Sequence, residues 1–229
     1  NEDLQGSDSE KKIKVASHYH SLTTDSYGVL SDVRTGGLKR DLSHAFANAK
    51  EWDASLEQRT YNWIDDFEAW EVSPSAFNET CEGGCKVHSG FYGIWKTIEQ
   101  PVLDAVADVG CARDSKEDNV LYITGHSLGA ALTHLAMFTL DDMGWKIAKT
   151  YSFEAPRVGN KAFANSFQER FASRDVPIYR ITHSEDPIVH LPPMDMEYHH
   201  VSTEVYYDAK GAYKVCDGSG EDGTCADQY

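Results

Sequence analysis

The stretch Ile123–Leu132, which reads ITGHSLGAAL, decides how the fold is interpreted. It contains the pattern G-x-S-x-G, centred on Ser127. The short apolar run 119–124 before it is typical of a buried strand, and the Ala- and Leu-rich segment 128–140 after it is typical of a helix. A serine at such a turn from strand to helix is exposed at the carboxyl edge of a sheet, so Ser127 is predicted to be a nucleophile.

The residues around Ser127 suit acyl transfer. A side chain at Gly125 or Gly129 would collide with the neighbouring strand and helix. The following helix directs its unpaired N–H groups toward the serine, which favours the negative oxygen of a tetrahedral intermediate. We therefore predict the backbone N–H of Leu128 as the first oxyanion donor. The alternative, a chance match to the pattern, is disfavoured by the strand and helix context.

Strand and helix signals alternate along the second half of the chain. Strands are predicted at 148–153 and 176–182, and helices at 91–109 and 162–171, with Pro101 expected to interrupt the first helix. This alternation predicts an α/β fold with a mostly parallel sheet. No internal repeat or linker divides the sequence, so residues 1–229 are expected to form a single domain.

Charge and hydropathy exclude some functions. The formal net charge of -16 would repel nucleic acid and anionic bilayers, so a nucleic-acid partner is disfavoured. The apolar runs are broken within a few residues, and no transmembrane segment is predicted.

Two pairs of cysteines bracket short glycine-containing loops. Cys81 pairs by position with Cys85, and Cys216 with Cys225, while Cys111 has no obvious partner. Two local disulfides indicate an oxidising compartment, as in a secreted protein. The alternative is a zinc site using Cys81, Cys85 and His88, but a second pair of ligands at metal-binding spacing is missing. The sequon at Asn78 predicts a glycosylation site beside the first disulfide.

Three further blocks accompany ITGHSLGAAL in a fixed order: CKVHSGF at 85–91, YSFEAPRVGN at 151–160 and YRITHSEDPIVHLPP at 179–193. Together the four blocks resemble the class 3 lipases, the fungal lipase-like family that also includes feruloyl esterases. The family's nucleophile segment usually has a glycine at the position of Ala130. The resemblance implies an α/β-hydrolase fold, in agreement with the alternation of strands and helices, and an activity that requires no metal or organic cofactor.

The resemblance assigns the triad acid to Asp186. This residue follows a predicted strand, so it is expected at the same sheet edge as Ser127, where it would orient and stabilise the imidazole of the base. In the family the base lies in a loop beyond a cysteine pair resembling Cys216 and Cys225. We therefore expect the base beyond Tyr229, in a C-terminal end that this chain lacks, with His200 as the fallback.

The resemblance also implies a second oxyanion donor, from a strand ending in FRGT or FRGS. Two segments are candidates, Val33–Gly37 and Ala45–Ala49, and both match that pattern poorly.

A lid is predicted in the segment 59–71, RTYNWIDDFEAWE. Helical spacing puts its apolar side chains on one face, namely Trp63, Ile64, Phe67 and Trp70. Part of the segment, NWIDDF, is similar to the family's lid. Such a helix would cover Ser127 in water and turn its aromatic face toward lipid at an interface. The alternative is an ordinary amphipathic helix packed on the core.

The sequence therefore predicts a secreted carboxylic ester hydrolase that forms an acyl-enzyme with Ser127, most simply a triacylglycerol lipase. Its partners would be a lipid or small ester substrate and a transient lipid–water interface. A feruloyl or other soluble-ester esterase is the alternative within the family. A different class of function, a catalytically inactive lipase-like binding protein, is disfavoured because binding does not require the strained turn at Ser127.

Overall fold

A computed structural model describes the protein over much of its length. The backbone is described for residues 12–17, 29–35, 38–40, 70–77, 81, 83–108, 111, 113 and 120–229. Side chains are described from residue 70 on, except at Ala76.

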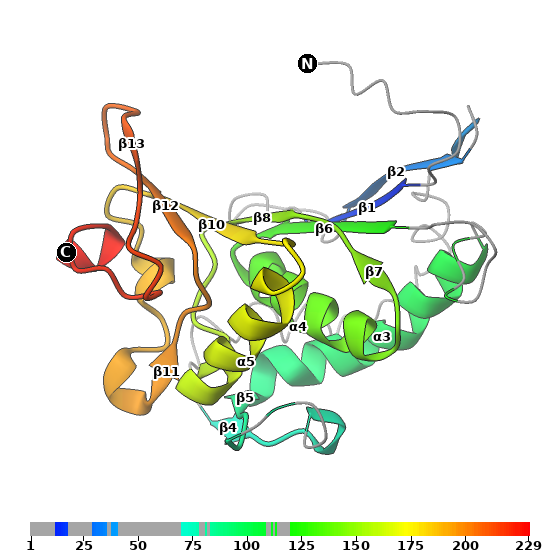
Figure 1. Ribbon diagram of the computed structural model, residues 1–229, viewed down its shortest axis with the longest axis horizontal. Coiled ribbons are helices and arrows are strands. Elements are labelled where there is room, and N and C mark those ends of the chain that lie inside the picture. Colours follow the sequence, from blue (N-terminus) through cyan, green and yellow to red (C-terminus); the bar gives the residue numbers. More distant parts are fainter. Residues whose placement is uncertain are drawn as a thin grey trace, which may run out of the picture.

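A nine-stranded, mostly parallel sheet forms the centre of the fold (Figure 1). Strands β1, β6, β8, β10 and β12 run parallel as successive neighbours, and the short β7 also pairs in parallel with β6. Antiparallel strands extend the two edges, with β13 next to β12 and with β2 and β3 beyond β1. The bounds are β1 Lys12–Ser17, β2 Val29–Thr35, β3 Leu38–Arg40, β6 Val120–His126, β7 Lys146–Ile147, β8 Thr150–Phe153, β10 Ile178–His183, β12 Glu204–Tyr207 and β13 Tyr213–Val215.

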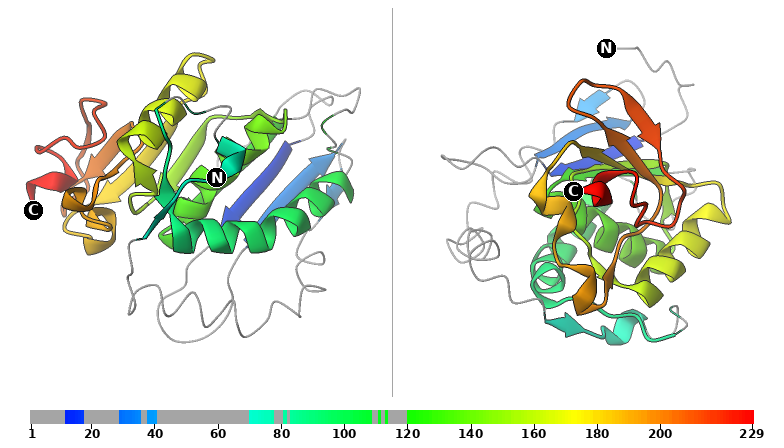
Figure 2. Two further views of the ribbon diagram at one scale, coloured as in Figure 1. Left: turned by 90° about the horizontal axis from the view of Figure 1, so that it is seen from below. Right: turned by 90° about the vertical axis from the view of Figure 1, so that its left-hand side faces the viewer.

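Within the described part of the chain, three helices cover one face of this sheet (Figures 1 and 2). They are α3 (Ser89–Asp108), α4 (Leu128–Asp142) and α5 (Lys161–Ala172). Helix α4 lies closest to the sheet and is buried along most of its length, from Leu128 to Leu140. The alternation of parallel strands and helices that the sequence predicts is confirmed. The predicted elements, which correspond to β6, β8, β10, α3, α4 and α5, begin and end within about two residues of the predicted bounds.

The prediction that Pro101 interrupts the first helix was wrong. Helix α3 continues through Pro101 to Asp108. A proline inside a helix removes one hydrogen bond and crowds the preceding turn. The helix tolerates this cost because its buried face packs into the core on both sides of the proline, through Phe91, Ile94 and Trp95 before it and Val102, Ala105 and Val106 after it.

A second, antiparallel sheet of four short strands lies at the lower left in Figure 1, where β4, β5 and β11 are labelled. Its order is β11 (Tyr198–His199), β9 (Gly159–Asn160), β5 (Val87–His88) and β4 (Glu71–Val72). Four 3-10 helices complete the described elements: η1 (Ser75–Phe77), η2 (Pro187–His190), η3 (Met194–Met196) and η4 (Ala226–Gln228).

The structure joins the cysteines in the two pairs that the sequence predicts. Cys81 is bonded to Cys85 and Cys216 to Cys225, while Cys111 is a buried free cysteine. Because Cys81 and Cys85 share a disulfide, they have no thiolates for zinc, and the alternative of a Cys81, Cys85 and His88 zinc site is not supported.

His88 caps the start of α3. Its Nδ1 accepts hydrogen bonds from the N–H groups of Gly90 (3.1 Å) and Phe91 (3.3 Å), which are among the donors that a helix leaves unsatisfied at its N-terminus. Burial of the imidazole lowers its pKa to about 4. The capping role therefore belongs to the neutral ring.

This burial predicts a loss of stability in acid. A histidine with a depressed pKa in the folded protein stabilises the fold above its unfolded pKa of about 6.5, and that contribution is lost as the pH falls toward about 4. We expect the free energy of unfolding to fall by up to ~1.4 kcal/mol per pH unit in this window. In His88→Asn, whose side chain still caps the helix but does not titrate, urea denaturation at a series of pH values should give a shallower slope. An unchanged slope would contradict the assignment.

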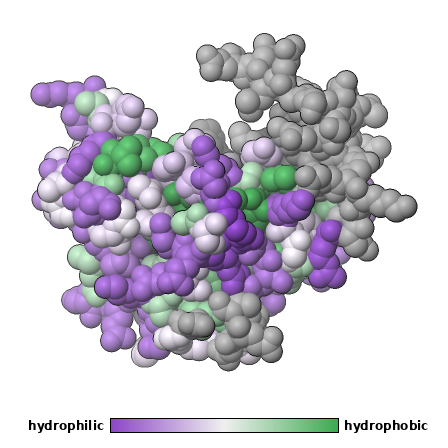
Figure 3. Space-filling model, in the orientation of Figure 1, coloured by the Kyte–Doolittle hydropathy of each residue, from purple (hydrophilic) through white to green (hydrophobic). Residues whose placement is uncertain are grey.

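The surface agrees with the acidic composition. Figure 3 shows a mostly hydrophilic face with small hydrophobic patches, one of them near β13, the strand on which Val215 is exposed. Among the described residues, no helix combines the length and the apolar character needed to cross a membrane.

Candidate active site

Ser127 lies in the tight turn between β6 and α4. Its backbone is in the left-handed region, with φ 53° and ψ -127°, which is a strained conformation for a residue with a side chain. The turn is held from both sides, because the Ser127 N–H donates to the carbonyl of Phe153 on β8 (2.9 Å) and the Ser127 carbonyl accepts from Ala130 N–H (2.9 Å). This is the geometry of a nucleophile elbow.

Leu128 is the first residue of α4, as the assignment of the oxyanion donor requires. The first N–H groups of a helix have no partner within the helix, and its dipole places partial positive charge at this end. The Leu128 N–H is therefore available, next to Ser127, for an oxygen that develops negative charge.

Asp186 reaches the same edge of the sheet from β10. Strands β6, β8 and β10 are parallel neighbours, so the residues that follow them lie at one edge, and Asp186 comes three residues after the end of β10. The side chain is half-buried, and its Oδ1 accepts from the N–H of Ile188 (2.8 Å). Its other oxygen accepts no hydrogen bond from the described residues, so the carboxylate has the capacity to hold an imidazole.

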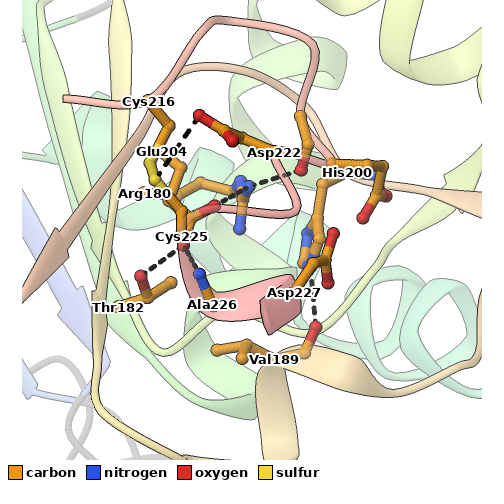
Figure 4. Close-up of polar contacts among 12 residues, drawn as sticks. Arg180, Thr182, Val189, His200, Glu204, Cys216, Asp222, Cys225, Ala226 and Asp227 are labelled. Atoms are coloured by element: carbon orange, nitrogen blue, oxygen red, sulfur yellow. Dashed lines mark hydrogen bonds and ion pairs between the residues drawn. A yellow bond between two sulfur atoms is a disulfide. The ribbon is translucent and has the colours of Figure 1, made fainter. Parts of the chain in front are cut away.

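His200 makes a buried contact of its own. The residue is buried between β11 and β12, and its Nε2 lies 2.7 Å from the carbonyl oxygen of Val189 (Figure 4). Burial, and then the positive charges of Arg180 and Arg157, lower the pKa of the imidazole well below its ordinary value. A ring that donates to a carbonyl and resists protonation is suited to a structural role, so the fallback assignment of His200 as the base is not taken further.

Glu154 belongs to this edge and was missed in the sequence. It directly follows β8, the strand between those that carry Ser127 and Asp186, and its Oε2 accepts from the N–H of His183 (3.3 Å). The signal was present, because Glu154 directly follows a predicted strand just as Ser127 and Asp186 follow theirs.

The residues that the structure describes do not place either candidate segment for the second oxyanion donor next to the elbow. Val33 and Arg34 on β2 pair with Ile13 and Lys12, at the start of β1, whereas the elbow is next to the end of β1, where Ser17 pairs with Gly125. The segment Ala45–Ala49 lies outside the described residues.

The predicted lid lies mostly outside the described residues, which include neither Trp63 nor Ile64 nor Phe67. Its last two positions are described and are not helical: Glu71 belongs to β4, and Trp70 directly precedes that strand with 68% of its surface exposed. The carbonyl of Trp70 accepts from Ser89 N–H at the start of α3 (2.8 Å), which holds this end in an extended path. Asn78, the predicted glycosylation site, also lies outside the described residues.

The described residues bring three metal-binding side chains within 4.8 Å of one another, namely Glu204, Cys216 and Cys225. Both sulfur atoms belong to one disulfide and carry no thiolate, so this cluster is not a metal site.

The elbow, the acid and the parallel sheet agree with the similarity to known proteins. The family described as lipase (class 3) matches residues 55–196, which is more than half of the chain. The chain belongs to the class 3 lipase family. The resemblance in its sequence blocks is thereby confirmed.

Similar proteins support this membership of the class 3 lipases. Secreted mono- and diacylglycerol lipase 1 of Fusarium solani is 33% identical in an alignment of 167 positions that covers 69% of this chain and 46% of that protein. The crystal structure of a mono- and diacylglycerol lipase from Aspergillus oryzae matches with a TM-score of 0.57 and 30% identity, over 69% of this chain and 56% of that one. The chain therefore spans about half the length of these relatives.

A third similar structure is that of a triacylglycerol lipase whose catalytic centre is described as a serine protease triad. It matches with a TM-score of 0.57 and 27% identity, over 73% of this chain and 61% of that one. As for the other two proteins, this match shows a similarity between that lipase and the present member of the class 3 lipase family.

Proposed function

We propose that this class 3 lipase is a carboxylic ester hydrolase that acts on acylglycerols through an acyl-enzyme on Ser127. The observation that carries the proposal is the strained Ser127 between β6 and the N-terminus of α4, with Asp186 at the same sheet edge. A strained backbone costs about 1–3 kcal/mol and persists where the surroundings enforce it, often for catalysis.

In this mechanism Ser127 Oγ attacks the ester carbonyl while a histidine takes its proton. The Leu128 N–H stabilises the oxygen of the tetrahedral intermediate, and Asp186 orients the imidazole. The histidine then returns the proton to the leaving alcohol, and water releases the fatty acid by the same steps. We infer that this base is a histidine other than His200, and the family resemblance favours one that follows Tyr229.

The acylglycerol class rests on similar proteins. Relatives at 33% identity are named mono- and diacylglycerol lipases, which favours partial glycerides over the triacylglycerol that the sequence alone suggests. A soluble-ester esterase is the alternative to be tested beside them. We also propose that the protein is secreted, since the two local disulfides, Cys81–Cys85 and Cys216–Cys225, suit an oxidising compartment and those relatives are named as secreted.

Labelling with a fluorophosphonate tests the nucleophile directly. We expect the full-length protein to form a stoichiometric adduct, with the added mass on the peptide that contains Ser127. A protein with Ser127→Ala should take no label. Because Ser173 is an exposed serine outside this edge, Ser173→Ala is the matched control and should label as fast as the wild type. Absence of Ser127-dependent labelling would favour the inactive binding protein and would overturn the proposal.

The substrate class is tested with emulsions of mono-, di- and triacylglycerols and with a soluble feruloyl ester. We expect the highest kcat/KM on the partial glycerides. Preference for the feruloyl ester would replace the acylglycerol assignment without affecting that of Ser127.

A further inference from the structure

Glu154 lies between the nucleophile and the acid on adjacent strands. It is the first residue after β8. The carbonyl of the preceding residue, Phe153, accepts from Ser127 N–H (2.9 Å), and the N–H of Glu154 donates to the carbonyl of Ile181 on β10 (2.9 Å). The main chain at Glu154 therefore connects the elbow on one side with the strand that leads to Asp186 on the other.

The Glu154 side chain extends this connection into the turn that carries Asp186. Its Oε2 accepts from the N–H of His183 (3.3 Å), and the carbonyl of His183 accepts in turn from the N–H of Asp186 (3.3 Å). Two hydrogen bonds through the backbone of His183 thus link the Glu154 carboxyl to the backbone of the acid.

The backbone of Glu154 is strained. Its φ is 48°, in the left-handed region that side-chain-bearing residues seldom adopt and glycine adopts freely. A glycine would fit this position with less strain, so the backbone does not explain the presence of a glutamate. The carboxyl group does, through its contact with the Asp186 turn.

Charged groups on the neighbouring elements favour the neutral form of this carboxyl. The side chain is half-buried, with two acids facing it, Asp186 after β10 and Glu204 on β12, and one base, Arg180 on β10. Burial first, and then the charge of Asp186, raise the pKa of Glu154 to about 8; the His183 N–H and Arg180 act in the opposite direction and Glu204 in the same one. At neutral pH the Glu154 carboxyl is therefore mostly in its neutral form.

We propose that Glu154 is a positioning residue for Asp186. In its neutral form, Glu154 holds the turn that carries Asp186 in a fixed position relative to the elbow at Ser127. The inference rests on the proposed hydrolase function. Ionised Glu154 would repel Asp186 and oppose the oxyanion that forms at Ser127, so turnover is expected to fall as Glu154 loses its proton.

Two variants at position 154 separate positioning from a purely structural role. Glu154→Gln keeps an acceptor for His183 N–H and cannot ionise. We expect this variant to retain at least about a third of the wild-type kcat at pH 6.5. In the wild type kcat should fall near pH 8, and in Glu154→Gln this fall should occur about one pH unit higher. Glu154→Gly removes the contact and suits the backbone, so we expect kcat to fall by about 10- to 100-fold while Tm stays the same or rises.

The assay measures kcat and KM for a soluble short-chain p-nitrophenyl ester from pH 5 to 10 on the full-length protein, with spontaneous hydrolysis subtracted, and Tm for each variant. Glu185→Gln is the matched control, because Glu185 is an exposed carboxylate directly before Asp186 and should show the wild-type pH profile.

The outcomes separate the two proposals. If the wild type is active, two results would overturn the role of Glu154 alone. One is an alkaline fall of kcat in Glu154→Gln at the same pH as in the wild type, and the other is a wild-type kcat in Glu154→Gly. A wild-type protein that neither hydrolyses esters nor takes the fluorophosphonate on Ser127 overturns the proposed function, and the role of Glu154 with it.

Discussion

Replacing Ser127 with alanine is expected to lower kcat by about 10⁶-fold, and replacing Asp186 with asparagine by about 10⁴-fold, because nucleophile, base and acid act as one unit. For the same reason the double variant should be no slower than Ser127→Ala alone. Single-turnover kinetics with a p-nitrophenyl ester, in which the acylation step is observed directly, check all three values. Losses that multiply in the double variant would contradict a shared role.

A stability measurement accompanies this experiment. The left-handed backbone at Ser127 predicts that Ser127→Gly unfolds with a free energy about 1 kcal/mol higher than that of the wild type, while its activity is as low as that of Ser127→Ala. Asp186→Asn keeps an oxygen for the Ile188 N–H, so its stability should be close to that of the wild type. A strongly destabilised Asp186→Asn would indicate that the loss of activity reflects unfolding instead of a lost triad acid.

The order of strands and helices in the second half of the chain was predictable because each element has a local signal. Buried strands such as β6 are short and β-branched, and they alternate with longer helical patterns. The family resemblance assigned Asp186, in agreement with its place after a strand, and the same rule of position would have located Glu154, since both follow strands that end at one edge. A local rule was insufficient at Pro101, where packing on both sides of the proline outweighs its cost within the helix.

The buried arginines were not predictable from local pattern. Arginine is usually exposed, and the acids that pair with Arg157 lie 64 and 70 residues further along the chain. Only the folded chain brings these groups together. In the sequence, the segment that contains Arg157 indicates the family but assigns the arginine no contact.

Arg157, Glu221 and Asp227 form a buried ion-pair cluster, the Arg157 cluster, which holds the C-terminal segment against the body of the protein. The guanidinium binds both oxygens of Glu221, at 3.0 and 2.7 Å, and Oδ1 of Asp227 at 3.0 Å. Its Nη1 donates to the carbonyls of His190 (2.7 Å) and Pro192 (3.2 Å), in the segment that follows the Asp186 turn. Figure 4 shows Asp227 beside His200 and Val189.

Charge balance in the Arg157 cluster depends on pH. Burial and the neighbouring Glu221 raise the pKa of Asp227 to about 7. Burial alone would raise the pKa of Glu221 also, but hydrogen bonds from Arg157 and Asp227 outweigh it and lower that pKa. Near neutral pH the guanidinium therefore faces a pair of acids of which Glu221 is the more readily ionised.

Arg157→Met is expected to lower the free energy of unfolding by about 3–5 kcal/mol at pH 7, because it leaves buried acids without their counterion. The loss should be larger at pH 8 than at pH 5. Without the guanidinium, burial is expected to raise the pKa of both acids in the folded variant. Its folded state then binds more protons than the unfolded state, and stability falls as the pH rises. Urea denaturation with a fixed m-value measures both differences.

Arg174→Met is the matched control for Arg157→Met, since Arg174 also makes two hydrogen bonds to one carboxylate, that of Asp141 (2.7 and 2.8 Å), but is 48% exposed. Its loss should cost no more than about 1 kcal/mol. The double variant Arg157→Met, Glu221→Leu should be more stable than Arg157→Met, because one buried charge is removed. It should remain less stable than the wild type, because Glu221 Oε1 also accepts from His200 N–H (2.8 Å) and this hydrogen bond is lost. Equal losses in Arg157→Met and Arg174→Met would mean that burial does not set the strength of these pairs.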